Sequence, residues 1–254
     1  MKQVKFLFVA LMAIVMSVSV TSCFDNDDNN IVQAGFFVKN DFGTLVMADG
    51  MKLNTNSTTA LLQGNFYYIF CQYDRSLITE NSKSVNITLL QDPICIDPKS
   101  EEQPSTYVEE GTNPLYAFNS DLRNGFLYFD QYTLITPIIF WYKYSSDSKE
   151  AKEEFNKHSF KVSYDPEKIK ADDTKLELTI NHIVRDKEGE TIKRDRSTNT
   201  FKAYNLRSAL EAFRNKTGKL PKNLVLKAKE NSYEDKLIKD KDYSTIEIEY
   251  PFEK

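Results

Sequence analysis

The sequence predicts an all-β protein built from two small domains, and three observations support this. The chain has 254 residues, which suits two modest domains because a folded domain takes roughly 100–200 residues. Aromatic residues make up 13% of the chain whereas only 8 glycines occur, a mixture typical of extended structure. Short runs of alternating apolar and polar residues recur between turns, and this period of two indicates half-buried strands.

The first 22 residues have the features of a lipoprotein signal peptide. Lys2 and Lys5 precede an apolar run over residues 6–15, which gives way to small polar residues. A membrane-spanning helix needs roughly 20 strongly apolar residues, so this run is too short to span. The stretch Val20-Thr21-Ser22-Cys23 resembles the lipobox of bacterial lipoproteins, in which the cysteine is acylated and becomes the new N-terminus. We therefore predict lipid attachment at Cys23 and a protein that is anchored to a membrane.

Residues 23–33 are predicted to form the lipidated cysteine and an acidic, solvated tether. The Asp and Asn residues behind Cys23 resemble the export tag that sends lipoproteins to the outer face of some diderm bacteria; a simple spacer is the alternative. We expect an outer-membrane lipoprotein exposed at the cell surface. Removal of residues 1–22 takes away two of 33 basic residues, so 31 remain against 37 acidic ones and the net charge becomes −6. This acidic balance argues against a nucleic-acid partner.

Residues 34–98 are predicted to form a small β-barrel domain. The run 36–39 is followed by the turn-rich Asn40-Asp41-Phe42-Gly43 and a returning strand, which indicates a hairpin. Further strand-like runs cover residues 51–53, 66–73 and 84–90. About five short strands in some 65 residues favour a closed barrel of the OB type or a compact sandwich.

Residues 99–112 are predicted to be a linker, and residues 113–254 an antiparallel β-sandwich. The linker carries charged and turn-forming residues with little that could enter a core. In the second domain, alternation favours strands at 126–130, 132–144, 160–164, 176–180, 224–228 and 246–250. One short helix interrupts them, with Asn205 as its cap, Leu206, Leu210 and Phe213 on one side, and Gly218 at its end.

Several of these segments, taken in order, resemble the NigD-like lipoproteins. The resemblance rests on the Asp/Asn tail behind Cys23, on residues 37–45 (FVKNDFGTL), on residues 160–166 (FKVSYDP) and on residues 224–227 (LVLK). It implies an N-terminal OB-type barrel joined to a C-terminal β-sandwich, and a link to a bacteriocin-associated operon. This chain departs from the pattern in charged inserts around 145–157 and 186–196. A shared fold does not by itself confer an activity.

No motif for catalysis, metal binding or cofactor binding is present in the sequence. The two histidines, His158 and His182, have no local partner motif, and His182 shares the parity of Leu178 and Ile180 on a predicted strand. We interpret His182 as a hydrogen-bonded core residue; the alternative, a metal ligand, would need three or four ligands that no local cluster offers. We therefore predict no enzyme activity, no metal and no cofactor.

Cys71 and Cys95 remain once Cys23 is lipidated, and two interpretations stay open. An even pair in an exported protein is typical of a disulfide, which would stabilise the barrel by roughly 3 kcal/mol. The alternative is two free thiols, since Cys71 lies in an apolar strand where cysteine behaves as a small hydrophobic residue.

The strand region 126–144 is rich in aromatic residues that have two possible roles. Exposed rings could stack on sugars or form a protein-binding hot spot, whereas buried rings would pack the core. The candidate binding residues are Tyr128, Tyr132, Trp141, Tyr142 and Tyr144.

These patterns favour a non-enzymatic, lipid-anchored envelope lipoprotein that binds a protein or a glycan. A first alternative, which the family resemblance implies, is a bacteriocin-associated immunity or inhibitor lipoprotein. A second is a glycan-active hydrolase, whose paired carboxylates would have to come from distant strands.

Overall fold

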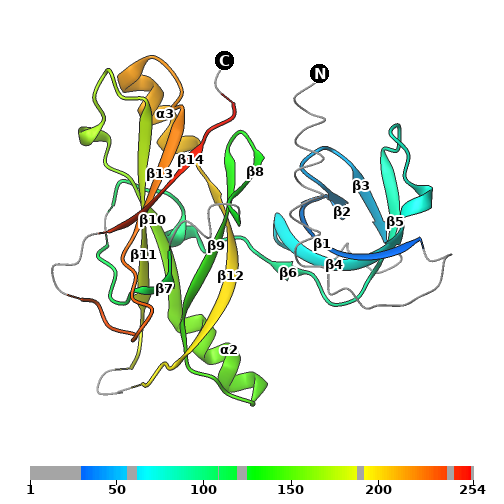
Figure 1. Cartoon of the computed structure of the whole chain (residues 1–254), viewed down its shortest axis with the longest axis horizontal. Coiled ribbons are helices and arrows are strands. Elements are labelled where there is room, and N and C mark those ends of the chain that lie inside the picture. Colours follow the sequence, from blue (N-terminus) through cyan, green and yellow to red (C-terminus); the bar gives the residue numbers. More distant parts are fainter. Residues whose placement is uncertain are drawn as a thin grey trace. The chain divides into compact units, whose positions relative to one another are not determined.

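The computed structural model describes residues 30–55, 62–107, 109–118, 125–187, 192–238 and 243–252. The predicted signal peptide, Cys23 and most of the predicted tether lie outside these residues. The chain divides into two compact units, residues 1–97 and 98–254 (Figure 1). Strands dominate both units, so the predicted all-β class is confirmed. None of the helices within the described ranges is long and apolar enough to cross a membrane.

The first unit is a closed five-stranded barrel. Its strands are β1 (Ile31–Asp41), β2 (Thr44–Val46), β3 (Lys52–Thr55), β4 (Phe66–Asp74) and β5 (Ser84–Leu89). They follow one another in the order β1-β2-β3-β5-β4, and β1 pairs with β4 to close the ring. The β3–β5 pair is parallel and the other pairs are antiparallel. This is the strand order of an OB-type Greek-key barrel, and closure leaves few exposed strand edges.

The barrel core follows directly from the alternation of the strands. Along β4 every second residue is buried, including Ile69 and Cys71. Val38 from β1 and Leu45 from β2 meet them in one apolar cluster. Strand β1 begins at Ile31, three residues before the predicted start of the domain, because residues 31–33 pair with residues 72–74. The short strand β6 (Ile94–Cys95) adds to the side of β4.

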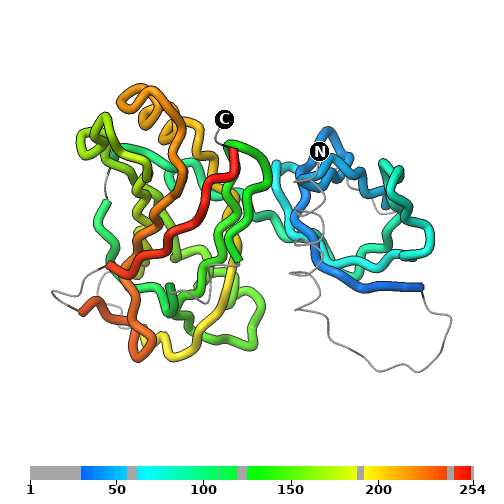
Figure 2. The backbone as a smooth tube through the Cα atoms, turned by 45° about the horizontal axis from the view of Figure 1, so that its top comes forward, coloured from blue at the N-terminus to red at the C-terminus, as the bar shows by residue number. Residues whose placement is uncertain are grey.

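The second unit packs two four-strand layers around a large apolar core (Figure 2). One layer has the order β10-β11-β13-β14, formed by β10 (His158–Ser163), β11 (Lys175–Val184), β13 (Asn223–Ala228) and β14 (Ser244–Glu249). The other contains β12 (Arg196–Asn205), β9 (Thr133–Tyr142) and β7 (Leu115–Ala117), with β8 (Leu127–Asp130) also paired to β9. The β-sandwich prediction is confirmed, although β11 and β13 run parallel.

Two α-helices occur in the described residues, one predicted and one not. Helix α3 (Arg207–Thr217) buries Leu210 and Phe213 and ends at Gly218, whose φ of 74° is the left-handed conformation that glycine tolerates. Helix α2 (Ser148–Lys157) falls in a segment that the sequence suggested was a charged insert. Asp147 caps it by accepting hydrogen bonds from the Lys149 and Glu150 amides.

Residues 99–112 do not form the predicted linker, because they pack against the second unit. The 3₁₀ turn η3 (Ser100–Glu102) buries Glu102 completely. One Glu102 oxygen accepts the Phe160 amide at 2.9 Å and the other accepts Lys202 Nζ at 3.2 Å. Further along, Ser105 exchanges backbone hydrogen bonds of 3.1 Å with Val162 and Tyr164 beside β10. The linker prediction was wrong because it assumed that the acidic residues of this segment face solvent. Glu102 is instead buried, and donors from the strands satisfy its carboxylate.

Candidate functional site

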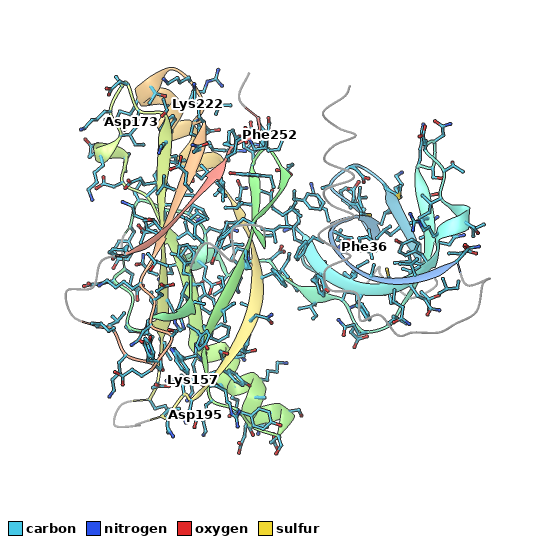
Figure 3. The ribbon with its side chains drawn as sticks, viewed as in Figure 1. Phe36, Lys157, Asp173, Asp195, Lys222 and Phe252 are labelled. Atoms are coloured by element: carbon cyan, nitrogen blue, oxygen red, sulfur yellow. The ribbon has the colours of Figure 1, made fainter. Side chains whose placement is uncertain are left out.

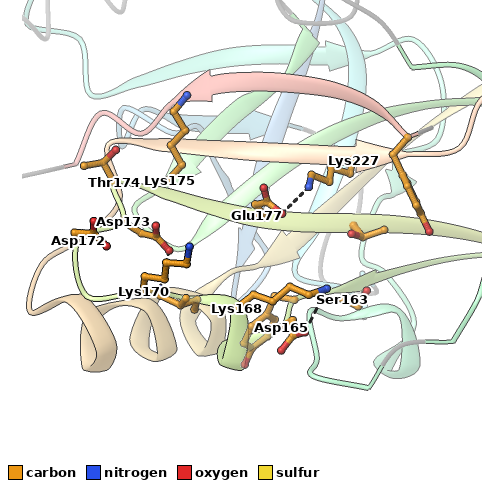
Figure 4. A pocket seen from close by; sticks show the side chains of 14 residues that line it. Ser163, Asp165, Lys168, Lys170, Asp172, Asp173, Thr174, Lys175, Glu177 and Lys227 are labelled. Carbon is orange, nitrogen blue, oxygen red and sulfur yellow. Dashed lines mark hydrogen bonds and ion pairs between the residues drawn. The ribbon is translucent and has the colours of Figure 1, made fainter.

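A polar groove of about 740 Å³ lies on the outer face of the β10-β11-β13-β14 sheet (Figure 4). Its floor is the solvent-facing side of β11 and β13. One wall is the connection from β10 to β11, which contains the 3₁₀ turn η5 (Pro166–Lys168) and continues to Thr174. Tyr243, just before β14, also lines it. In Figure 3, Asp173 and Lys222 mark this end of the second unit, where the Lys222 amide donates to Thr174 O.

Strand alternation sets the floor of the groove. On β11, Leu176 and Leu178 face the core, so Lys175, Glu177 and Thr179 point outward. Lys227 projects from the neighbouring strand β13, where its Nζ lies 2.6 Å from Glu177 Oε2 (Figure 4). The floor is therefore a surface of polar groups held in place by cross-strand pairing.

Local hydrogen bonds hold the wall in shape. Asp165 caps η5 by accepting the Glu167 amide at 3.0 Å. Asp173 Oδ2 accepts the Lys170 amide at 2.7 Å, which fixes the turn before β11. Side chains that short turns tie to the backbone lose little further freedom when a ligand binds, so the wall is organised in advance.

The charges around the groove balance. Among the lining residues are the basic side chains Lys168, Lys170, Lys175 and Lys227, and the acidic side chains Asp165, Asp172, Asp173 and Glu177. Lys175 also pairs with Glu247 at 2.7 Å, at the side of the groove. With four cations against four anions, the groove has no excess charge to select a strongly charged ligand. Ammonium groups donate and carboxylates accept, which suits a ligand rich in hydroxyl groups.

The five predicted binding aromatics do not form one platform. Tyr128 packs edge-on against Tyr250 at a centroid distance of 5.5 Å, and Trp141 is only 6% exposed, with Nε1 donating to Asn231 O at 2.7 Å. Tyr142 OH donates to Ala151 O of α2 at 3.1 Å. Tyr128, Trp141 and Tyr142 therefore contact other parts of the second unit and serve its packing.

The other two aromatics are more open, but they too lie outside the groove. The Arg207 guanidinium lies 4.0 Å from the centroid of the Tyr132 ring, a cation–π contact. Tyr144 is 70% exposed. The aromatic residues that line the groove are the buried Tyr164 and the more exposed Tyr243, and neither is among the five predicted binding aromatics. The outward series Lys175, Glu177 and Thr179 was visible in the sequence, but the wall that turns it into a groove was not.

Cys71 and Cys95 are both free thiols in the structure. Cys95 pairs with Tyr67 in the β4–β6 ladder, four residues along β4 from Cys71. Four residues of strand span about 13 Å, beyond the roughly 4.4–6.8 Å between the Cα atoms of a disulfide. Of the two open interpretations, the disulfide is therefore wrong for this structure. Burial raises the pKa of the Cys71 thiol to about 12.

A chain of buried polar side chains crosses the other end of the second unit. His182 Nδ1 lies 2.9 Å from Pro114 O, and His182 Nε2 lies 2.9 Å from His158 Nδ1. His158 Nε2 is 3.3 Å from Glu154 Oε1, which also accepts Arg194 Nε at 2.7 Å. In Figure 3, Lys157 and Asp195, the sequence neighbours of His158 and Arg194, mark this end.

Arg194 gathers three carboxylates around its buried guanidinium. Besides Glu154, it holds Asp186 through two hydrogen bonds of 2.9 and 2.6 Å, and Asp235 lies 3.7 Å away. Burial acts to raise the pKa of Glu154, but the hydrogen bond from His158 and the charge of Arg194 outweigh it and hold this pKa at about 2. The hydrogen bonds from Arg194 also lower the pKa of Asp186, whereas burial raises that of Asp235.

This buried network joins segments rather than opening onto solvent. It connects α2, β10, β11 and the residues before β12, and its histidines stack against Phe160. Burial, with the charge of His158, lowers the pKa of His182 to about 3. The interpretation of His182 as a hydrogen-bonded core residue is confirmed. No cluster of three or more metal-binding side chains occurs in the part of the chain that the structure describes.

The fold and the groove define a two-unit β-protein, an OB-type barrel followed by a β-sandwich, with a polar groove on one sheet. Its fold is similar to that of a solved protein of Bacteroides fragilis named "putative lipoprotein", with a TM-score of 0.72 and 26% sequence identity over 86% of this chain and 98% of the other. A protein of unknown function from Bacteroides vulgatus matches with a TM-score of 0.48 and 13% identity, over 87% of this chain and 91% of the other. No family model and no curated protein matches the sequence.

Proposed function

We propose that this chain is a non-enzymatic envelope lipoprotein of the NigD-like type, anchored through Cys23, that binds a neutral glycan in the polar groove. The anchor is supported by the Val20-Thr21-Ser22-Cys23 motif and by the similar fold of the Bacteroides fragilis protein named "putative lipoprotein". The acidic composition of the tether supports a location in the outer membrane at the cell surface.

The balanced charge of the groove carries the proposal of a glycan ligand. A volume of about 740 Å³ falls in the range of roughly 300–1,000 Å³ typical of ligand pockets. Alternating donors and acceptors match the hydroxyl groups of a sugar, and the Tyr243 ring, which has Lys229 Nζ 5.4 Å from its centroid, adds an aromatic group to the groove. A short neutral oligosaccharide fits this chemistry.

The ion pairs of the groove support binding rather than hydrolysis. A glycosidase needs one carboxyl group that carries a proton and a second that acts on the opposite side of the bond. Glu177 is already paired within the groove, with Lys227 Nζ 2.6 Å from its Oε2. This carboxylate is therefore engaged with a cation, and its oxygens are placed to accept hydrogen bonds from a bound ligand.

Glycan binding is tested by calorimetry of the mature protein with neutral oligosaccharides selected from a glycan array. We expect Tyr243→Ala and Glu177→Gln each to weaken binding about tenfold, which corresponds to about 1.4 kcal/mol. Tyr144→Ala is the matched control, since Tyr144 is exposed but lies outside the groove. A glycan whose affinity falls equally with Tyr144→Ala, or an array without any bound glycan, would contradict the proposal.

The anchor is tested separately by Cys23→Ala. We expect this variant to move from the membrane fraction to the soluble fraction, because the acyl chains are lost. Retention of Cys23→Ala in the membrane pellet would exclude lipid anchoring at this residue.

A further inference from the structure

Two exposed apolar side chains lie at the end of the barrel where β1 begins. Ile31 is 49% exposed and Leu77, in the 3₁₀ turn η2 (Arg75–Leu77), is 66% exposed. Ile31 pairs with Asp74, and the Arg75 amide donates to Asn30 O at 2.8 Å. The start of β1 and the turn after β4 therefore lie together, as Figures 1 and 2 both show.

The turn that carries Leu77 is held in a defined shape and bears an available cation. Asp74 caps it by accepting the Ser76 amide at 2.9 Å and the Ser76 hydroxyl at 2.6 Å. Arg75 is exposed and forms no ion pair with any residue that the structure describes. A rigid turn with an apolar side chain and an adjacent guanidinium matches a membrane interface, where acyl chains and phosphate groups lie side by side.

The length of chain before the barrel identifies the membrane as the occupant of this surface. Only seven residue steps separate Cys23 from Asn30, and a fully extended chain spans at most about 3.5 Å per residue, or about 25 Å. With Cys23 acylated, as the proposed function requires, this end of the barrel stays close to the bilayer at a high effective concentration.

We propose that Ile31 and the turn Arg75–Leu77 form a membrane-contact surface that docks the barrel on the bilayer holding Cys23. The lipid chains supply the attachment, and the contact surface orients the barrel by inserting Leu77 and placing Arg75 among lipid phosphates.

Phe42 provides a matched control within the same barrel. It is fully exposed, more so than Leu77 at 66%, but it follows the opposite end of β1, eleven residues after Ile31. Its backbone φ of 49° belongs to the turn between β1 and β2. An apolar residue at Phe42 therefore tests whether exposure alone causes membrane contact.

The experiment uses the acylated mature protein in vesicles of phosphatidylethanolamine and phosphatidylglycerol that carry bromine on their acyl chains. Leu77→Trp and Phe42→Trp are compared after subtraction of the buried Trp141 signal of the parent protein. We expect bromine to reduce the added emission of Leu77→Trp by about half, because interfacial side chains lie about 5–10 Å into the bilayer surface. The added emission of Phe42→Trp should not be reduced by bromine. Adding Arg75→Ala to Leu77→Trp should weaken the quenching.

Flotation of the same samples separates this proposal from the anchor. If both variants float with the vesicles and Leu77→Trp is quenched no more than Phe42→Trp, the contact surface is overturned while the anchor stands. If the acylated protein does not float at all, the anchor is overturned, and the contact surface with it.

Discussion

His158 and His182 are hydrogen bonded to each other in the core of the second unit, with Nδ1 of the first 2.9 Å from Nε2 of the second. Their rings are 16° from parallel. Pro114 O can only accept, so His182 Nδ1 carries the proton of that bond and His182 Nε2 accepts from His158. His158 Nε2 faces an ionised Glu154 oxygen. The bond between the two rings therefore runs from His158 Nδ1–H to His182 Nε2.

Nitrogen NMR should therefore detect His182 as a neutral Nδ1–H ring at pH 7. The chain contains only two histidines, so the spectrum has two imidazole spin systems. We expect the Nδ1–H rather than the Nε2–H tautomer of His182, because Pro114 O accepts the Nδ1 proton and His182 Nε2 accepts from His158. Long-range proton–nitrogen spectra distinguish these states, and His158→Gln assigns the signals. An Nε2–H tautomer of His182 at pH 7 would be incompatible with the network.

Acid should destabilise the protein through His182 before most carboxylates titrate. The pKa of His182 is about 3 in the folded state against about 6.5 when unfolded, so the unfolded chain binds more protons between these values. The free energy of unfolding should then fall as pH drops, by about 2 kcal/mol between pH 6.5 and pH 5. Glu154, whose pKa in the folded state is about 2, adds a further loss of stability below about pH 4.5. The raised pKa of Asp235 partly offsets the losses from His182 and Glu154.

Urea unfolding at pH 7, 6 and 5 measures this dependence, with His182→Gln as the comparison. Glutamine keeps an N–H donor for Pro114 O but does not titrate. We expect His182→Gln to be less stable than the parent protein at pH 7. Its free energy of unfolding should also change less than that of the parent between pH 7 and pH 5. Equal slopes for the two proteins would exclude His182 as the titrating group.

Local patterns predicted the elements whose burial follows a regular period. The barrel strands and α3 were visible because Ile69 and Cys71 repeat every two residues, and Leu206, Leu210 and Phe213 repeat at helical spacing. Helix α2 was missed because it is mostly charged, and its buried residue is Glu154. A carboxylate is buried only where partners from elsewhere satisfy it, and Arg194 lies 40 residues away.

The candidate groove could not be predicted either, because it too depends on contacts between segments that are distant in the chain. Alternation along β11 predicts that Lys175 and Glu177 face outward, but it does not show that the connection before β11 rises beside them as a wall. Tyr243 approaches from a segment 66 residues beyond Glu177 in the chain. Contacts between segments this distant depend on the tertiary fold, which no window of sequence contains.

The two cysteines of the barrel should react very differently with alkylating reagents. Cys95 is exposed, whereas Cys71 is buried and its pKa is raised to about 12, so little of it is the reactive thiolate at pH 8. Brief treatment of the native protein with iodoacetamide should modify Cys95 alone, and treatment in denaturant without reductant should modify both. Mass analysis of the peptides measures this. Resistance of both residues until a reductant is added would mean that they form a disulfide.

Glu102 should be among the most sensitive charged positions of the protein. Its carboxylate accepts the amides of Lys99 and Phe160 and the ammonium of Lys202, all within 3.2 Å. Glu102→Ala leaves a buried amide and a nearly buried ammonium without their acceptor, and breaking a buried ion pair in this way costs about 3–5 kcal/mol. Glu101→Ala is the matched control, because Glu101 is its exposed neighbour and its removal should not change the urea midpoint. Limited proteolysis should also cut Glu102→Ala faster within residues 99–107, since this segment loses its attachment to β10. If the two variants unfold at the same urea concentration, the buried carboxylate does not hold this segment in place.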